Sequence, residues 1–306
     1  AEQGIPVAPR VAFDWNTAQN RLQGRARDRY LVNGKALTVG QVFAAPDQAK
    51  VLRLIAEQGR AGFYEGEVAA DMVSTLQAAG GAHTLDDFAA TRCDYVTPIS
   101  TIYYGHRLTE LPPNGQGATA LLMANILSAF NIGQYHPLSA ERAHLEAEAA
   151  KLAYDARNRY IADPEHSHQL ERFLSAANAA DLASLIDRHS VLDLEDSRIE
   201  AVHKETISLT VVDKDRMALS LIVSIFDSFG SGIASDKFGI LLQNRGAGFT
   251  LAKGHPNEAR GGKRPLHTII PGMLERPGAF IMPFGVMGGA YQPTGHMRFM
   301  SNIVDY

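Results

Sequence analysis

Two strand-like runs on either side of a polar turn occupy residues 206–225, which read TISLTVVDKDRMALSLIVSI. The runs Thr206 to Asp213 and Met217 to Ile225 are rich in β-branched and aliphatic residues, and polar residues 214–216 separate them. We therefore predict an antiparallel hairpin. With a three-residue turn, Thr206 lies directly across from Ser224, because the numbers of opposed residues add up to the same total.

The predicted Thr206–Ser224 pair has two interpretations. Directly opposed side chains share one face of a hairpin, with Cβ atoms roughly 5 Å apart, so two hydroxyl groups meet at its open end. Spacing alone favours a pair that merely stabilises the hairpin. A hydroxyl nucleophile with a second hydroxyl beside it is the alternative, and it needs support from other residues.

The segments on the two sides of this hairpin differ in character. Before it, apolar residues recur at helical spacing in Ala49 to Gln58, Glu67 to Ala79 and Ser139 to Tyr160. A strand pair, Val96 to Tyr104 and His106 to Leu111, interrupts these helices. After the hairpin, glycine is frequent. This order predicts an α+β fold in which helices pack on a sheet, without alternating βαβ units.

Composition and charge restrict the function classes. The 306 residues have 45% hydrophobic and 20% charged content, and the net charge of −4 gives no attraction to nucleic acid or an anionic membrane. No apolar run reaches the ~18 residues of a spanning helix. Cys93 is the one cysteine, which excludes an internal disulfide; we interpret it as a bystander, with a thiol nucleophile as the alternative. The compartment stays open between cytoplasm and periplasm.

Several catalytic motifs are missing from the sequence. It contains no GxSxG elbow, no HExxH and no GxxxxGK[ST] phosphate loop. His166-Ser167-His168 has a spacing that can bind a metal ion, but no third ligand is indicated, so we predict a solvated loop and no metal site. Gly230-Ser231-Gly232 lacks the third glycine and the βαβ context of a dinucleotide loop, so we predict a tight turn. No cofactor is implied.

A series of ordered motifs supplies the support that the hairpin alone lacks. They are Thr206 to Asp213, Phe229-Gly230-Ser231-Gly232, Gly239 to Arg245, Gly254-His255-Pro256-Asn257, Gly262 to Leu266 and Met287-Gly288-Gly289. Together with Phe63-Tyr64-Glu65-Gly66 and Leu111-Pro112-Pro113 upstream, they resemble the γ-glutamyltransferase family of N-terminal-nucleophile hydrolases. The resemblance covers nearly the whole chain. It implies an α/β (α+β) fold, a four-layer αββα sandwich.

The resemblance implies a precursor that cuts itself between Glu205 and Thr206. Residues 1–205 are then the mostly helical C-terminal part of a large subunit, and residues 206–306 are the N-terminal part of a small catalytic subunit, in one composite domain. Cleavage frees the α-amine of Thr206. Its pKa, near 8 in general, suits a base that takes the proton of the same residue's hydroxyl.

The resemblance also assigns supporting roles. Ser224 matches the second hydroxyl, which contacts the nucleophile and assists self-cleavage. Gly288 and Gly289 match the glycine pair whose backbone N–H groups form the oxyanion hole. The implied partners are a small-molecule amide substrate and the two subunits cut from one precursor, with a homodimer of such heterodimers as one possible assembly.

The substrate-binding positions depart from those of the true transpeptidases. By resemblance, those enzymes carry an asparagine at Phe226, an aspartate for the substrate's α-ammonium group at Gly248, and a serine pair at His267-Thr268. Arg245 stands where a neutral glutamine is usual. An arginine repels an ammonium group and binds a carboxylate. A structural ion pair is the alternative role for Arg245.

These departures predict an acyl donor that lacks the α-amino group, such as a short dicarboxylate monoamide. The strings Gln243-Asn244-Arg245-Gly246 and His267 to Pro271 are similar to the branch of oxamate amidohydrolases and cephalosporin acylases. We therefore expect a self-processing amidohydrolase or acyltransferase. A true γ-glutamyl transferase or glutathione hydrolase is the alternative. From another class, the alternative is an uncleaved, catalytically silent binding protein.

Two further expectations concern the chain ends and the turn. By resemblance, the family's N-terminal arginine segment and its last strands are absent, so we expect a fragment of a longer protein. The family commonly has glycine where Arg216 stands. Arg216 is therefore strained if this turn needs a positive φ.

Overall fold

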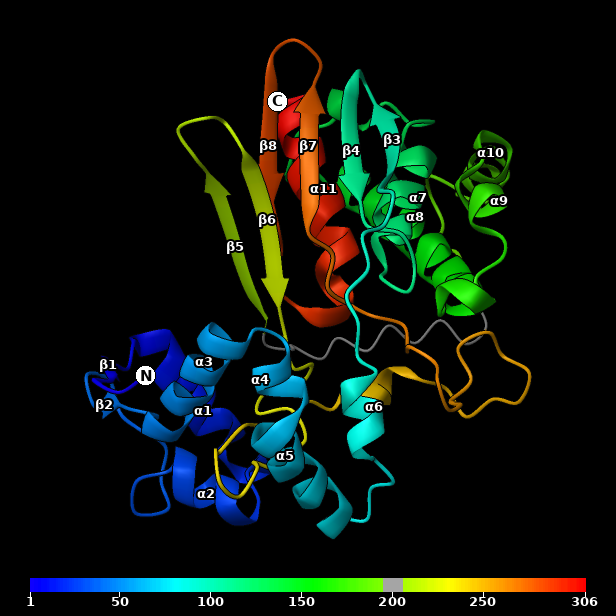
Figure 1. Cartoon of the computed structure of the whole chain (residues 1–306). Coiled ribbons are helices and arrows are strands. Elements are labelled where there is room, and N and C mark those ends of the chain that lie inside the picture. The colour runs from blue at the N-terminus through cyan, green and yellow to red at the C-terminus, as the bar shows by residue number, and fades with distance from the viewer. Residues whose placement is uncertain (195–205) are drawn as a thin grey trace. The chain divides into compact units, whose positions relative to one another are not determined.

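The computed structural model describes residues 1–194 and 206–306, which form two compact units. The first unit is Ala1–Tyr95 with Ile225–Asn244, and the second is Val96–Ser224 with Arg245–Tyr306 (Figure 1). Each unit therefore combines residues from both sides of position 206. Glu205, on one side of the predicted cut, lies outside the described residues.

Helices form most of the first unit. They are α1 (Pro9–Ala18), α2 (Gly24–Tyr30), α3 (Pro46–Gln58), α4 (Ala61–Tyr64), α5 (Gly66–Ala78) and α6 (Leu85–Ala89), beside the short strands β1 (Ile5–Pro6) and β2 (Val42–Phe43). The predicted helices 49–58 and 67–79 are confirmed. A capping box starts α6, in which Thr84 Oγ1 accepts from the Asp87 N–H and the Asp87 carboxylate accepts from the Thr84 N–H.

An aromatic cluster packs residues 225–244 against the N-terminal part of the first unit. Trp15 packs edge-on against Phe43 and Phe229, with ring centroids 5.1 and 5.8 Å apart. The tight turn predicted at residues 230–232 is confirmed, because both of its glycines have positive φ. A Cβ on Gly232 would overlap a backbone carbonyl of the unit, so only glycine fits there.

A four-stranded antiparallel sheet forms one layer of the second unit. Its strands are β3 (Ile99–Tyr103), β4 (His106–Glu110), β7 (Gly272–Arg276) and β8 (Phe280–Phe284), in the order β3-β4-β7-β8. The predicted pairing of the first two strands is confirmed, and their turn has positive φ at Tyr104 and Gly105. The central pair, β4 with β7, joins distant parts of the sequence.

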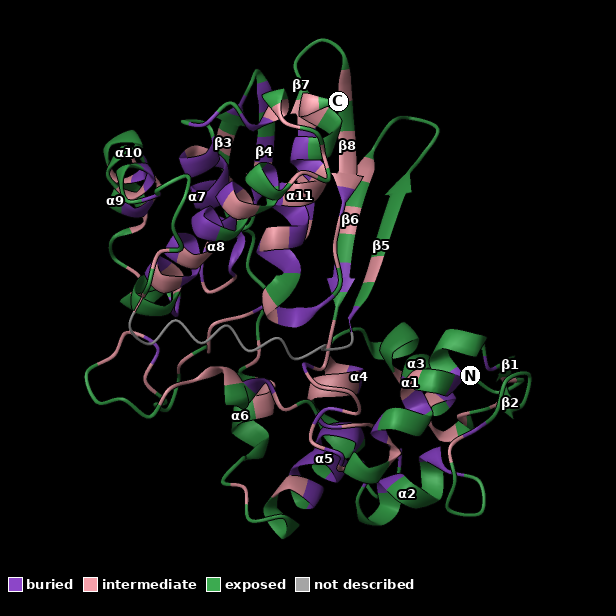
Figure 2. Cartoon of the chain, turned by 180° about the vertical axis from the view of Figure 1, so that it is seen from behind, coloured by how far each residue is buried: buried purple, intermediate pink, exposed green. Residues whose placement is uncertain are grey.

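Helices form a layer on one face of this sheet, in which α7 packs against the strands (Figure 1). They are α7 (Gly117–Leu127), α8 (Ala140–Tyr160), α9 (Leu170–Leu174), α10 (Ala176–Ser184) and α11 (Gln292–Asp305). Buried residues run along α7, because this apolar helix contacts the sheet and the helices α8, α10 and α11 (Figure 2). The main core is built around Leu121 and Ile126 of α7 and Leu108 of β4. The predicted helix 139–160 is confirmed.

The hairpin of residues 206–225 has the predicted register. Strand β5 (Ile207–Val212) pairs with β6 (Ala218–Val223) so that Ile207 lies opposite Val223, which leaves residues 214–216 as the turn. Arg216 has φ +65°, so the turn does require the left-handed conformation that is unfavourable for arginine. The condition for the expected strain, a positive φ at Arg216, is therefore met.

The second unit thus stacks a helical layer on a layer of strands, and the predicted α+β class is confirmed. Short 3-10 segments complete the two units: η1 (Gln19–Arg21), η2 (Ile132–Gln134), η3 (Pro164–His166), η4 (Arg245–Gly248) and η5 (Gly289–Tyr291). Within residues 1–194 and 206–306, no helix combines the length and apolar character that a bilayer crossing requires.

Candidate active site

The predicted nucleophile, Thr206, directly precedes β5. Its side chain is buried, and Ser224, directly after β6, is partly buried. Extending the hairpin register by one pair places Thr206 opposite Ser224. The two hydroxyl groups therefore lie at the same end and on the same face of the hairpin. The geometry agrees with the predicted pairing of the two residues.

Close contacts connect the hairpin to the segment that follows β8. Ser220 Oγ donates a hydrogen bond to the Phe284 carbonyl over 2.7 Å. A Cβ on Gly285 would overlap the side chain of Ser208, so the backbone approaches the hairpin closely at this point. Ser208 lies two residues after Thr206, and Gly285 shortly precedes the predicted oxyanion glycines. The predicted nucleophile and these glycines therefore lie on adjoining segments.

Gly288 and Gly289 have backbone conformations that favour glycine, with φ +132° and +56°. Both residues are buried. Their carbonyls are fixed, because Gly288 O accepts from the Tyr291 N–H over 3.1 Å and Gly289 O accepts from Gln116 Nε2 over 2.9 Å. Within the described ranges, neither glycine N–H donates to a protein oxygen. Both are thus available to an oxygen atom of a bound molecule.

A buried arginine lies among the residues predicted to bind a carboxylate. Arg245 begins η4 with 5% of its surface exposed, and its Nη1 donates to Thr268 Oγ1 over 2.8 Å. Burial, followed by the charge of Arg245, lowers the pKa of His267 to about 4. The His267 imidazole is therefore neutral at pH 7, and Arg245 gives this part of the site its positive charge.

Gly248 ends the same short helix and packs against backbone. A Cβ at this position would lie 2.8 Å from the Leu266 carbonyl oxygen and 3.5 Å from Pro265 Cβ. The Gly248 carbonyl also accepts from Asn257 Nδ2 over 2.6 Å. This backbone conformation leaves no room for an aspartate side chain, so position 248 offers no carboxylate to a substrate's ammonium group.

Gln116, at the N-terminus of α7, is a site residue that the sequence did not predict. Its Nε2 donates to the carbonyls of Thr268 and Gly289 over 2.7 and 2.9 Å, and its Oε1 accepts from Arg157 Nη1 over 2.7 Å. It joins the two loops that carry the predicted carboxylate-binding and oxyanion residues. The string Asn114-Gly115-Gln116-Gly117 indicates a loop before a helix, and no periodicity marks Gln116 as functional.

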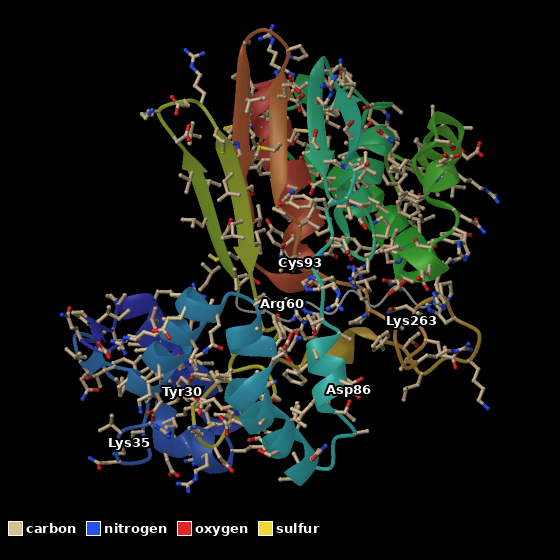
Figure 3. The ribbon with its side chains drawn as sticks, in the orientation of Figure 1. Tyr30, Lys35, Arg60, Asp86, Cys93 and Lys263 are labelled. Atoms are coloured by element: carbon tan, nitrogen blue, oxygen red, sulfur yellow. The ribbon has the colours of Figure 1, made fainter. Side chains whose placement is uncertain are left out.

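Two further residues from the sequence analysis, Phe226 and Cys93, belong to the other compact unit. Phe226 belongs to the first unit, where it is 5% exposed and has φ +83°. Cys93, labelled in Figure 3, also belongs to the first unit and is exposed. Over residues 1–194 and 206–306, no three His, Cys, Asp or Glu side chains are grouped so that they could hold a metal ion.

Known proteins resemble most of the chain. A family model described as gamma-glutamyltranspeptidase matches residues 1–306. The chain is 36% identical over 280 residues to the glutathione hydrolase-like YwrD proenzyme of Bacillus subtilis, across 91% of this chain and 53% of that protein. It is 31% identical over 296 residues to the oxamate amidohydrolase proenzyme of Klebsiella pneumoniae, across 96% and 55%. The chain therefore spans about half the length of the curated relatives it matches.

Solved structures show the same fold. The cephalosporin acylase from Bacillus halodurans has a TM-score of 0.88 and 36% identity, over 99% of this chain and 56% of that chain. The γ-glutamyltranspeptidase of Helicobacter pylori has a TM-score of 0.60 and 23% identity, over 63% of this chain and 56% of that chain, which is a likeness in fold alone. The predicted α+β sandwich of the N-terminal-nucleophile hydrolases is confirmed.

Proposed function

The chain belongs to the γ-glutamyltranspeptidase family, and on that premise we propose that its protein is a self-processing amidohydrolase with Thr206 as the nucleophile. We also propose that its acyl donor carries a carboxylate but no α-amino group, as in a short dicarboxylate monoamide. The single observation that carries this choice of donor is the buried Arg245–Thr268 contact next to Gly248, where a side chain has no room.

The chemistry begins once the bond between residues 205 and 206 is cut. The freed α-amine of Thr206 takes the proton of the hydroxyl while that oxygen attacks the amide carbon of the substrate. The N–H groups of Gly288 and Gly289 stabilise the resulting negative oxygen. The amine product leaves with the proton, and an ester joins the acyl group to Thr206. Water then hydrolyses this ester in the same manner, which releases a carboxylic acid and restores the hydroxyl.

Ser224 supports the preceding self-cleavage in this proposal. Before the cut, the Thr206 nitrogen belongs to a peptide bond and cannot act as a base, so another group must assist the hydroxyl. The pairing of β5 with β6 supports this role, because its continuation by one pair brings Ser224 across from Thr206. Residues 1–205 and 206–306 would then belong to two subunits from one precursor, and each compact unit contains parts of both.

The charge of the site argues for a donor without an α-ammonium group. Arg245 is buried and positively charged, and the neighbouring His267 is neutral at pH 7. A carboxylate is the group that a guanidinium binds most strongly, through paired hydrogen bonds. An ammonium group would meet the same positive charge without a compensating carboxylate at Gly248. Removing the α-amino group removes that repulsion.

Two chromogenic substrates that differ only in the α-amino group test the proposed donor. They are glutaryl p-nitroanilide and γ-glutamyl p-nitroanilide. We expect kcat/KM to be about 100-fold higher for the glutaryl compound, because placing two like charges next to each other in a binding site costs several kcal/mol. A preference for the γ-glutamyl compound would contradict the donor and favour the glutathione hydrolase alternative, which is the activity named for the Escherichia coli relative, 30% identical to this chain.

The variant Arg245→Met tests the proposed role of the guanidinium. With glutaryl p-nitroanilide we expect kcat/KM to fall about 10- to 100-fold, because a hydrogen bond to a charged group contributes about 1.5–3 kcal/mol. For the γ-glutamyl compound kcat/KM should fall less, because the variant also removes the repulsion between Arg245 and the substrate's ammonium group. The matched control is Arg107→Met, whose arginine is exposed and pairs with Glu275 on the sheet. Equal losses for both substrates would contradict the role.

Mass spectrometry of the purified protein tests self-cleavage. We expect wild-type protein to give two fragments separated before Thr206, and Thr206→Ala to stay uncut and inactive, because alanine has no hydroxyl. Thr206→Ser retains the hydroxyl that attacks the peptide bond, so it should still be cut. An uncut, inactive wild-type chain would instead favour the silent binding protein.

A further inference from the structure

The Gln116 carboxamide connects three separate segments of the second unit. The residue has 0% of its surface exposed. Its Nε2 donates to the Thr268 and Gly289 carbonyls, and its Oε1 accepts from Arg157 Nη1. Its backbone N–H donates to the His267 carbonyl over 3.0 Å. Such a buried amide is restricted in orientation, because a rotated carboxamide would direct its oxygen at a carbonyl oxygen.

The bonds to the glycine pair determine the directions of two peptide planes. In a trans peptide, the carbonyl and the following N–H point in opposite directions. The Tyr291 N–H holds the Gly288 carbonyl, so the Gly289 N–H points the other way. Gln116 holds the next carbonyl, that of Gly289. Together the two bonds restrain both backbone angles of Gly289, a residue that otherwise has wide conformational freedom.

Helix α8 supports this arrangement from the other side of the carboxamide. Arg157 donates to Gln116 Oε1 and stacks on the Tyr154 ring, 4.5 Å from its centroid. The Tyr154 hydroxyl donates to the Ala290 carbonyl, directly after the glycine pair. Burial lowers the pKa of Arg157, a direction that signals an interior position for its charge. The consecutive carbonyls of Gly289 and Ala290 thus accept hydrogen bonds from Gln116 and Tyr154. Arg157 contacts both of these side chains.

We propose that Gln116 is a positioning residue that holds the oxyanion glycines in their reactive orientation. This inference rests on the proposed function, since it concerns the same glycine pair. Glutamine suits the task because one carboxamide supplies two donors for the carbonyls and one acceptor for Arg157. A carboxylate of the same length keeps the acceptor and loses both donors. A thioether of similar volume loses donors and acceptor together.

The variants Gln116→Met and Gln116→Glu test the proposal with glutaryl p-nitroanilide. We expect both to lower kcat about 10- to 100-fold, because small displacements of catalytic groups cost up to about 100-fold. KM should change less than kcat, since the oxyanion forms only after binding. Gln116→Glu is the decisive variant, because it retains the bond to Arg157. A merely structural role through Arg157 predicts near wild-type kcat for it.

The control is Gln134→Met, which removes an exposed glutamine from the same unit, one that bonds only weakly to the Phe130 carbonyl over 3.4 Å. It should keep wild-type kcat and KM. Thermal unfolding shows whether a Gln116 variant is still folded at the assay temperature. If one is unfolded there, kcat of Gln116→Glu is measured at a lower temperature, at which it is folded. If wild-type protein is active and Gln116→Glu retains its kcat, the positioning role is wrong and the proposed function stands. If wild-type protein hydrolyses neither anilide, the proposed function itself fails.

Discussion

The backbone around Gly248 determines which side chains the carboxylate-binding segment can contain. A Cβ there would meet the Leu266 carbonyl at 2.8 Å, whereas a Cβ on Gly246, in the same short helix, meets nothing within 4 Å. Neither glycine has a positive φ, so the difference between them is one of space. The lack of a side chain at position 248 is therefore built into the backbone path, because an added side chain would meet the Leu266 carbonyl.

We expect Gly248→Ala to lower the free energy of unfolding by about 1–3 kcal/mol, the usual cost of forcing an extra carbon into a packed site. Gly246→Ala is the matched control, and it should cause no loss, because alanine replaces glycine in open space. Chemical denaturation of both variants provides the measurement. Equal unfolding free energies for the two variants would contradict this prediction, because they would show that the Leu266 backbone moves away from the added carbon at little cost.

His267, in the same segment, makes the free energy of unfolding depend on pH. Burial, and then Arg245, lower the pKa of folded His267 from 6.5 to about 4, so the unfolded chain binds a proton more readily. The resulting stability is complete above about pH 6.5 and decreases as the pH falls toward 4. We expect the unfolding free energy of wild-type protein to fall more steeply over this range than that of His267→Gln. Parallel curves for the two proteins would contradict the lowered pKa.

At the level of elements, the β5–β6 turn shows a conflict between residue type and backbone. The Asp213 carboxylate accepts from the N–H groups of Asp215 and Met217 over 2.9 and 2.8 Å, and the Arg216 N–H donates to the Asp213 carbonyl over 3.0 Å. These bonds define a three-residue loop whose last position adopts the left-handed conformation. Arg216 occupies that position with φ +65°.

We therefore expect Arg216→Gly to raise the free energy of unfolding by about 0.5–1 kcal/mol, the left-handed penalty of an L-residue less the entropic cost of glycine. Lys214→Gly is the control in the same turn. Its backbone has no positive φ, so glycine should lower stability there by about 0.5–1 kcal/mol. Thermal and chemical unfolding measure both effects. A loss of stability in both variants would contradict the assigned turn.

The elements that the sequence predicted are those defined by neighbouring residues. The hairpin register followed from one three-residue turn. The pairing of β4 with β7 was not predicted, because alternation within a strand does not identify a distant partner. Gln116 was missed for the same reason, since its acceptors lie 152 and 173 residues away. A family motif could point to the glycine pair, but not to the side chain that holds it.

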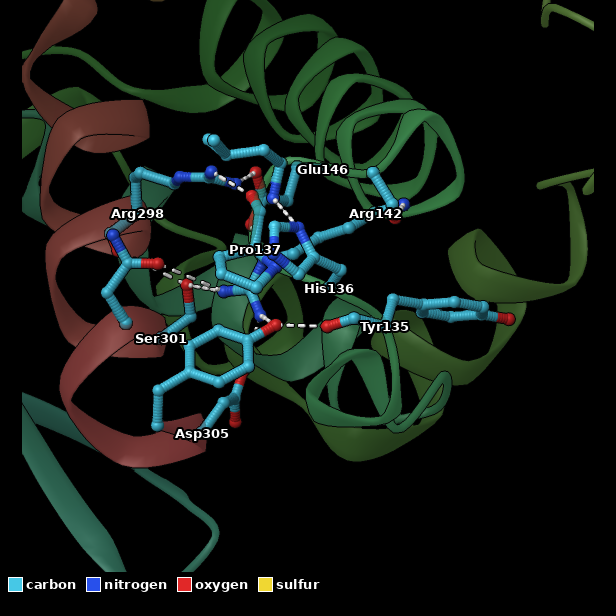
Figure 4. Close-up of polar contacts among 12 residues, drawn as sticks. Tyr135, His136, Pro137, Arg142, Glu146, Arg298, Ser301 and Asp305 are labelled. Carbon is cyan, nitrogen blue, oxygen red and sulfur yellow. Dashed lines mark hydrogen bonds and ion pairs between the residues drawn. The ribbon is translucent and has the colours of Figure 1, made fainter.

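At the scale of the whole chain, an ionic cluster joins α8 and α11, the helices that carry Arg157 and follow the glycine pair of the proposed site. Arg142 of α8 has 0% of its side chain exposed and bonds to Glu146 over 2.9 Å, to Asp305 of α11 over 3.2 Å and to Ser301 Oγ over 2.7 Å (Figure 4). Helix α11 begins directly after the oxyanion loop, and α8 carries the residues that support Gln116. The cluster therefore ties α11, which follows the glycine pair, to α8, which carries Arg157.

Arg142→Met tests this link. A buried ion pair that loses one partner costs about 3–5 kcal/mol, because the remaining charge stays in a poorly solvated place. In the variant, Glu146 still pairs with Arg298, whereas the buried Asp305 carboxylate loses its arginine partner. Burial already raises the pKa of Asp305 in the presence of Arg142. A raised carboxyl pKa favours the protonated folded form, so the loss of unfolding free energy in the variant should shrink as the pH falls.

The control is Arg159→Met on the same helix. Its arginine forms a largely exposed pair with Asp155 at the same four-residue spacing, and the loss of that pair should cost less than about 0.5 kcal/mol. Equal losses for both variants, or a deficit independent of pH, would show that the cluster does not hold α8 and α11 together.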